Sequence, residues 1–200
     1  MGLSIFYSGL LRNVKQIPSL TMELLDICDD LKWPCDEFSP TTINPIQGMW
    51  FAPPGADRIW MTFLPSGVLA EPEYNLNEEG IEVWMNSDWK DNQMNPRTQF
   101  AGPDAHMQVI KILKYVSQKY FHHFHLLDES EYWESGNAEK CKDWFAMFSV
   151  WMNNMSADLG KIDGRGYESG ESIQGRVDEL LNNGRSIDDI LKVMGNPYRK

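Results

Sequence analysis

"TQFAGPDAHMQVIKILKYVSQKYFHHFHLLD", residues 98–128, carries the signals of a helix that leads directly into a strand. Gly102 suits the position before a helix, Pro103 suits its first turn, and Asp104 is favourable at the positive end of the helix dipole. The apolar residues that follow recur at helical spacing: Val109, Ile110, Leu113, Val116 and Tyr120. We therefore predict a helix from residue 103 with one buried face, followed by a strand in "HHFHLLD".

The residues before this stretch predict a strand, a helix and then a group of strands. "LSIFYSGLL" predicts the first strand, and residues 17–33 have apolar side chains at helical spacing, with Pro18 in the first turn. Residues 33–48 contain three prolines and predict a loop. Further strands are predicted in "GMWFAPP", "DRIWMTFL", "GVLAE" and "GIEVWMN". The pattern predicts an α+β fold, a largely antiparallel sheet of about five to six strands with helices packed on one face.

The C-terminal third predicts one long helix and a separate helical hairpin. Residues 137–160 are apolar on one helical face, and Asn137 is the expected N-cap. Residues 161–170 are rich in glycine and predict a linker, and residues 171–200 predict two short helices. The predicted organisation is a main domain over residues 1–160, a linker over 161–170 and a hairpin over 171–200.

The charge of the chain restricts its partners. The sequence has 18 basic and 29 acidic residues, a net charge of −11, and the excess acid lies in the first 160 positions. An acidic surface repels nucleic acid and anionic lipid, and it suits a basic protein partner or cations. The N-terminus lacks a basic region before its apolar residues, and no run of about 18 apolar residues exists. With three scattered cysteines, these features lead us to expect a cytoplasmic protein without membrane or nucleic-acid contacts.

Three of the four histidines lie in one predicted strand, which raises the possibility of a metal site. Side chains alternate along a strand, so two groups are expected to face opposite ways: His123, His125 and Leu127, and His122, Phe124 and Leu126. His106, in the first turn of the preceding helix, can approach the far end of the strand. His106, His123 and His125, with Asp128 or Glu129, would supply a zinc-like ligand set. The alternative is that the histidines are ordinary polar residues of a solvent-facing strand.

The acidic turn "DESEYWES" allows a further enzymatic interpretation. Glu129 or Glu131 could act as the general base of a metal-dependent hydrolase. Two carboxylates beside Trp133 could also form a glycosidase pair with the indole as a sugar platform. An acidic turn between a strand and a helix explains the same residues without any catalysis. The sequence contains no P-loop, no nucleophile elbow and no dinucleotide-binding motif.

The motifs "TQFAG-x-x-x-H", then "YF" and "DE-x-x-YW", resemble those of an uncharacterised family of bacterial hypothetical proteins. The resemblance covers about residues 1–160. It implies a bacterial cytosolic domain, and because that family has no assigned activity it implies no functional residues.

We therefore carry two functional hypotheses forward. The first is a non-catalytic, acidic, cytosolic protein-binding protein of the immunity or regulatory kind, with a basic protein partner and Trp89 and Trp133 as contact residues. The second is a metal-dependent hydrolase, with zinc at His106, His123 and His125 and Glu129 or Glu131 as base.

Overall fold

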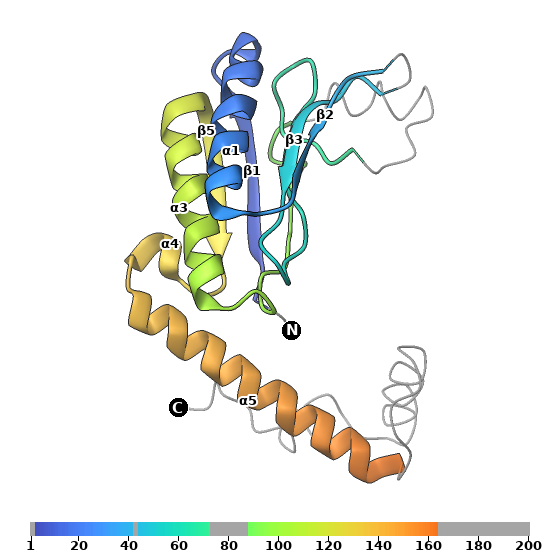
Figure 1. The fold of residues 1–200 in the computed structure, drawn as a ribbon, viewed down its shortest axis with the longest axis vertical. Coiled ribbons are helices and arrows are strands. Elements are labelled where there is room, and N and C mark those ends of the chain that lie inside the picture. Colours follow the sequence, from blue (N-terminus) through green and yellow to red (C-terminus); the bar gives the residue numbers. More distant parts are fainter. Residues whose placement is uncertain (1–2, 42–43, 73–87, 164–200) are drawn as a thin grey trace. The chain divides into compact units, whose positions relative to one another are not determined.

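The computed structural model describes residues 3–41, 44–72 and 88–163 (Figure 1). The chain divides into two compact units, Met1–Phe145 and Ala146–Lys200. The first unit contains every described strand and the helices that pack on them.

The first sheet pairs strands from opposite ends of this unit. β1 (Ile5–Leu11) runs antiparallel to β5 (Phe121–Asp128), with Ile5 opposite Asp128 and Leu10 opposite His123. The register shifts at Leu11, which lies opposite Phe121, so His122 is an extra residue in β5. With this bulge His122 is exposed, and it does not share the face of Phe124 and Leu126 as the simple alternation predicted.

The second sheet has the order β2-β3-β4 and contains β2 (Cys35–Phe38), β3 (Gln47–Phe51) and β4 (Ile59–Phe63). Two irregular segments lie beside β1. Leu69 N–H donates to the Gly9 carbonyl at 3.0 Å and Ala70 N–H donates to the Thr62 carbonyl at 3.0 Å, which places residues 69–70 between β1 and β4. Farther along β1, Tyr7 and Met94 exchange backbone hydrogen bonds of 3.0 and 2.8 Å.

The helices α1 (Ile17–Leu31) and α3 (Pro103–Tyr120) cover the strands (Figure 1). The 3-10 turn η1 (Val14–Gln16) leads into α1. The Tyr115 hydroxyl of α3 donates to the Glu23 carboxylate of α1 at 2.9 Å, so the two helices are neighbours. Their apolar faces bury residues such as Leu20, Leu24 and Leu113, each 0% exposed, against the strands. This core joins hydrophobic side chains of α1, α3 and the strands with Leu69 and Met94 from the segments beside β1.

Two further helices follow β5. α4 (Tyr132–Ser135) is a single turn, and α5 (Ala138–Asp163) begins where Asn137 Oδ1 accepts the N–H groups of Glu139 and Lys140. The Asn137 cap is therefore as predicted. Within the first unit α5 buries Cys141 and Phe145. In the second unit Phe148 and Trp151 contact each other at 5.9 Å between ring centroids.

The structure confirms the α+β class and the antiparallel pairing, and it differs from the prediction in the division of the strands. The five described strands form a two-stranded and a three-stranded sheet. β2 lies in the segment that was predicted to be a loop. The prediction failed because Asp36 and Glu37 are both exposed and break the alternating pattern of a strand, and because this segment becomes a strand only by pairing with β3. None of the described helices is long and apolar enough to cross a membrane.

Three predicted segments fall wholly or partly beyond the described part of the chain. The strand in "GIEVWMN", residues 80–86, lies outside the described residues, as do residues 164–170 of the predicted linker and the hairpin over 171–200. α5 continues to Asp163, so the first three residues of the predicted linker are helical.

Candidate binding site

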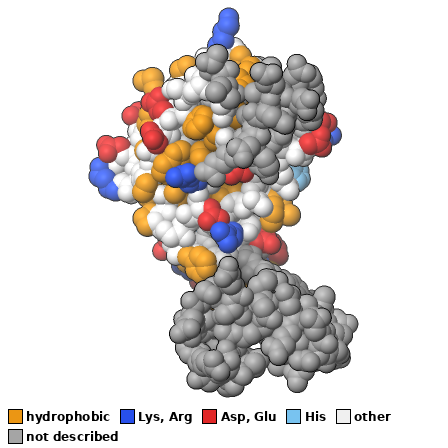
Figure 2. All heavy atoms as spheres, turned by 90° about the vertical axis from the view of Figure 1, so that its right-hand side faces the viewer, with side chains coloured by type: hydrophobic (Ala, Val, Ile, Leu, Met, Phe, Trp, Pro, Cys, Tyr) orange, Lys and Arg blue, Asp and Glu red, His pale blue; other side chains and the backbone are white. Residues whose placement is uncertain are grey.

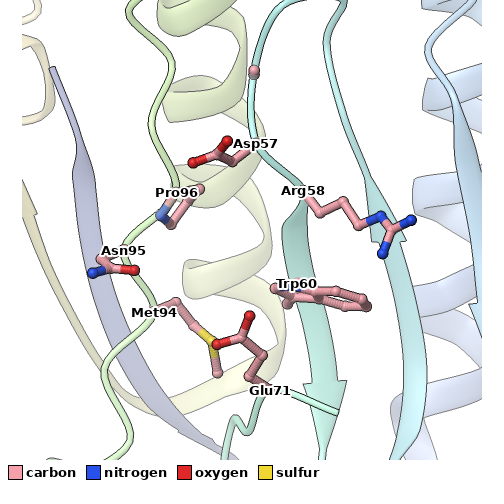
Figure 3. Close-up of a pocket in the computed structure, with 8 residues that line it drawn as sticks. Asp57, Arg58, Trp60, Glu71, Met94, Asn95 and Pro96 are labelled. Atoms are coloured by element: carbon pink, nitrogen blue, oxygen red, sulfur yellow. The ribbon is translucent and has the colours of Figure 1, made fainter. Parts of the chain in front are cut away.

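A pocket opens where β4 and the segment beside β1 separate. Residues 69–70 fill the space between β1 and β4 at one end, and Asp57 N–H donates to the Arg97 carbonyl at 2.9 Å at the other end. Between these connections lies a pocket of about 400 Å³ (Figure 3). Its lining residues are Ala56, Asp57, Arg58, Trp60, Glu71, Met94, Asn95 and Pro96. The volume is at the lower end of the usual range for ligand sites, about 300–1,000 Å³.

Two carboxylates belong to the pocket lining, one near each end. Asp57 accepts hydrogen bonds from Arg97 Nε at 2.8 Å and Nη2 at 3.3 Å. These bonds lower the pKa of Asp57, so its carboxyl is ionised at neutral pH. The Glu71 carboxylate lies at the opposite end, turned toward Met94 and the edge of Trp60 (Figure 3).

Tyr7 of β1 binds the backbone of Trp60, one of the lining residues. Its hydroxyl donates to the Trp60 carbonyl at 2.8 Å, and its side chain is 0% exposed. Burial raises the pKa of Tyr7, the bond to Trp60 opposes that shift, and the negative charge of Glu71 adds to it.

A guanidinium stacks on two indoles beside the pocket. Trp50 and Trp60 are directly paired across β3 and β4, and their ring centroids are 6.5 Å apart. The Arg58 guanidinium carbon lies 4.6 Å from the Trp50 ring centroid and 5.5 Å from the Trp60 ring centroid. In Figure 3 the Arg58 side chain extends away from Asp57 and Glu71, so its charge is directed to the indoles and not between the carboxylates.

The surface around this part of the molecule mixes apolar and charged groups. Figure 2 views the molecule from the side on which β2 and β3 lie in Figure 1, and it shows hydrophobic side chains gathered in the middle of the described surface. Acidic and basic side chains flank them. Apolar contact area within a charged rim is the usual composition of a protein interface.

His106 lies in a separate, fully buried polar cluster. Its Nδ1 is 2.6 Å from Thr98 Oγ1, and its Nε2 is 3.0 Å from Asp128 Oδ1 and 2.9 Å from Ser130 Oγ. Asp128 also accepts the backbone N–H groups of Ser130 and Trp133 at 2.8 and 3.0 Å. Burial alone would raise the pKa of Asp128, but the bonds from His106, Ser130 and Trp133 outweigh it and lower that pKa.

Every polar side chain of this cluster has a hydrogen-bond partner. The Thr98 hydroxyl donates to the Leu3 carbonyl at 3.3 Å, and the Ser130 hydroxyl donates to Asp128 Oδ2 at 3.0 Å. The residue types are those of a hydrolytic triad, but Ser130 and Asp128 both contact the same ring nitrogen and all three side chains are buried. A triad needs the acid and the nucleophile on opposite nitrogens and an accessible hydroxyl, so this cluster supports the fold.

The three histidines of the metal hypothesis are not brought together. His106 is 0% exposed and bonded inside the protein, whereas His123 and His125 are exposed on β5. The His123 ring stacks on Trp89 at 5.5 Å between centroids, and His122 lies 4.1 Å from His123. Within residues 3–41, 44–72 and 88–163, no group of three His, Cys, Asp or Glu side chains could hold a metal ion. No described feature of the structure therefore supports the zinc set or its general base.

The remaining predicted site residues have structural contacts. Glu129 accepts the Ser4 backbone N–H at 2.7 Å, and Glu131 forms an ion pair with Lys140. Trp133 is half-buried, packs on Phe124 at 6.0 Å and has Lys114 Nζ 5.5 Å from its ring centroid.

Sequence reasoning did not identify the pocket. The available signal was the alternation in "DRIWMTFL", which places Arg58 and Trp60 on the same face of a strand. Residues 71 and 94–96 also line the pocket, and only the tertiary structure brings them close to β4.

Comparison with protein-family models, with curated proteins and with solved structures found no match to this chain. The pocket geometry is therefore the principal observation that bears on function.

Proposed function

We propose that the protein is a non-catalytic binding protein whose partner is a positively charged protein. The pocket between β4 and residues 94–97 carries this proposal, because two of its lining side chains are carboxylates in a chain of net charge −11. Opposite charge increases the rate of encounter, and an apolar wall beside charged groups gives the contact its specificity.

The composition of the pocket favours binding over catalysis. Asp57 is held by Arg97, and the other polar lining residues are Arg58, Glu71 and Asn95. Among the described residues that line this pocket there is no nucleophile with an adjacent base, as acyl transfer would require. Trp89 and Trp133, both half-buried, are proposed as additional contact residues of the partner.

Immunity or regulatory proteins act by binding of this kind, and we propose that role here. The free cysteines Cys28, Cys35 and Cys141 suit a reducing compartment, so the cytoplasm is the proposed location.

A peptide array tests the proposal. Peptides of equal length and graded net charge are probed with labelled full-length protein at low salt. We expect retention to rise with positive peptide charge and to fall as salt is added.

Two variants make the test specific to the pocket. Glu71→Lys changes the pocket charge, and Asp29→Lys makes the same change at an exposed site on α1. Glu71→Lys should reduce retention much more than Asp29→Lys. Equal effects would show that attraction is spread over the surface, and no retention of basic peptides would disprove the proposed function.

A further inference from the structure

We propose that Cys28 and Cys35 form an oxidation-sensitive pair, which hydrogen peroxide converts into a disulfide within one chain. Both are free thiols in the structure. This modification site lies at the junction of α1 and β2, and it does not depend on the proposed partner of the pocket.

The chain between the two cysteines folds back on itself. Cys28 lies in the last turn of α1, and Cys35 is the first residue of β2. Lys32 ends the helix in the left-handed conformation with φ 58°, and the Trp33 N–H donates to the Cys28 carbonyl at 2.9 Å. The Trp33 ring stacks on Phe51, which is directly opposite Cys35 in the β2–β3 pair. This reversal brings both cysteines to the same hydrophobic core.

The two sulfur atoms are neighbours within that core. Burial raises the pKa of the Cys28 thiol to about 12, and the negative charge that Cys35 can carry and a hydrogen bond with Cys35 add to this increase. Disulfide formation requires two cysteines whose side chains point toward each other across a short distance. Thiols that already form a hydrogen bond meet this requirement.

The difference in exposure gives the two thiols different roles. Cys35 is partly exposed, whereas Cys28 is only 1% exposed. Peroxide therefore reaches Cys35 first, and the Cys35 thiolate attacks one peroxide oxygen. The O–O bond breaks, Cys35 becomes a sulfenic acid, and the released hydroxide takes up a proton to form water.

Cys28 completes the reaction from inside the core. Its sulfur attacks the Cys35 sulfur, the S–S bond forms, and the S–O bond breaks. The hydroxyl group leaves as water with the Cys28 proton. In total two thiols are oxidised to one disulfide while one peroxide is reduced to two waters. The bond would fasten β2, an outer strand of the described three-stranded sheet, to the end of α1.

Cys141 is a natural control for this reaction. It is 0% exposed on α5 and lies outside the hydrophobic core that contains Cys28 and Cys35. Burial raises the pKa of its thiol, which makes it a poor nucleophile at neutral pH. Cys141 should therefore stay reduced while the other two thiols are consumed.

Peptide mapping of the folded full-length protein tests the proposal. The protein is treated with hydrogen peroxide, the remaining thiols are alkylated, and the chain is digested with trypsin. Because Lys32 lies between the two cysteines, digestion leaves them on separate peptides, residues 16–32 and 33–58. We expect these peptides to be joined after peroxide treatment, to separate on reduction, and Cys141 to be recovered alkylated.

Three variants assign the roles of the thiols. Cys35→Ala should slow the loss of the remaining thiols at least about tenfold, whereas Cys141→Ala should form the bridge at the wild-type rate. Cys28→Ala should stop at the sulfenic acid of Cys35, which dimedone traps.

The wild-type map decides the outcome even if a variant folds poorly. Recovery of residues 16–32 and 33–58 as unlinked peptides, with Cys35 either unmodified or carrying two or three oxygens, would overturn the proposal. Linkage of residues 33–58 to the same peptide of a second chain would overturn it too, because Cys28 would then not be the second thiol.

Discussion

His106 Nε2 lies 3.0 Å from Asp128 Oδ1, and both side chains are 0% exposed. The bond joins the first turn of α3 to the last residue of β5, which are 22 residues apart in sequence. Because Thr98 and Ser130 complete the bonding, the cluster also fixes the segment before α3 and the turn after β5. A buried polar cluster with every member bonded restricts the arrangement of the elements that contribute to it.

Removal of the imidazole should therefore destabilise the fold. His106→Ala leaves the Asp128 carboxylate buried with one donor fewer, and we expect a loss of about 3 kcal/mol in the free energy of unfolding. Urea titration followed by tryptophan fluorescence measures it. His125→Ala, at an exposed position of β5, should change the same quantity by less than about 0.5 kcal/mol. Similar small losses for both variants would contradict the structural role of His106.

The same cluster should make the free energy of unfolding decrease at acidic pH. The folded protein lowers the pKa of Asp128 below its unfolded value of about 3.9. The carboxylate therefore contributes stability above about pH 4, and the contribution is lost as the pH falls through the lowered folded pKa. Denaturant titrations between about pH 2 and 6 should show a shallower decline for Asp128→Asn than for the wild type. Identical slopes would show that Asp128 is not the responsible group.

Two glycines with positive φ should respond very differently to alanine. Gly48 has φ +137°, and a Cβ there would lie 2.1 Å from the Met61 carbonyl oxygen of the neighbouring strand. Gly136 has φ +60°, and a Cβ there would meet nothing within 4 Å. We expect Gly136→Ala to cost about 1 kcal/mol from backbone strain alone and Gly48→Ala to cost clearly more, because β3 and β4 must separate. Thermal unfolding compares the two, and equal shifts would contradict the close approach of these strands.

The first turns of α5 should be part of the core, and the next turn should not. Phe145 is 5% exposed, and its ring contacts His106 edge-on at 5.3 Å between centroids. Phe145→Ala should therefore cost about 3–5 kcal/mol. Met147, two residues later, is 46% exposed, and Met147→Ala should cost less than about 1 kcal/mol. Chemical denaturation of both variants measures the difference, which should disappear if α5 does not pack on His106.

Short stretches of sequence were enough to predict most of the described helices and strands, but few of the residues of the candidate site. The start of α3 at Pro103 and the cap of α5 at Asn137 were predictable, because each depends on residues within one turn. β2 was missed because Asp36 and Glu37 are both exposed, and only the pairing with β3 makes the segment a strand. The side of β5 on which His122 lies was mispredicted because a single extra residue reverses the alternation.

The sequence by itself determined the α+β class, the acidic charge and the position of His106 on the buried face of a helix, since composition and periodicity are local properties. Only the tertiary structure decided that His106 bonds to Asp128 and Ser130 while His123 and His125 remain at the surface. It also decided that Glu71, Trp60 and Met94 line one pocket. The physical reason is that the distance between residues far apart in sequence depends on strand register and on where a sheet separates, and a local pattern specifies neither.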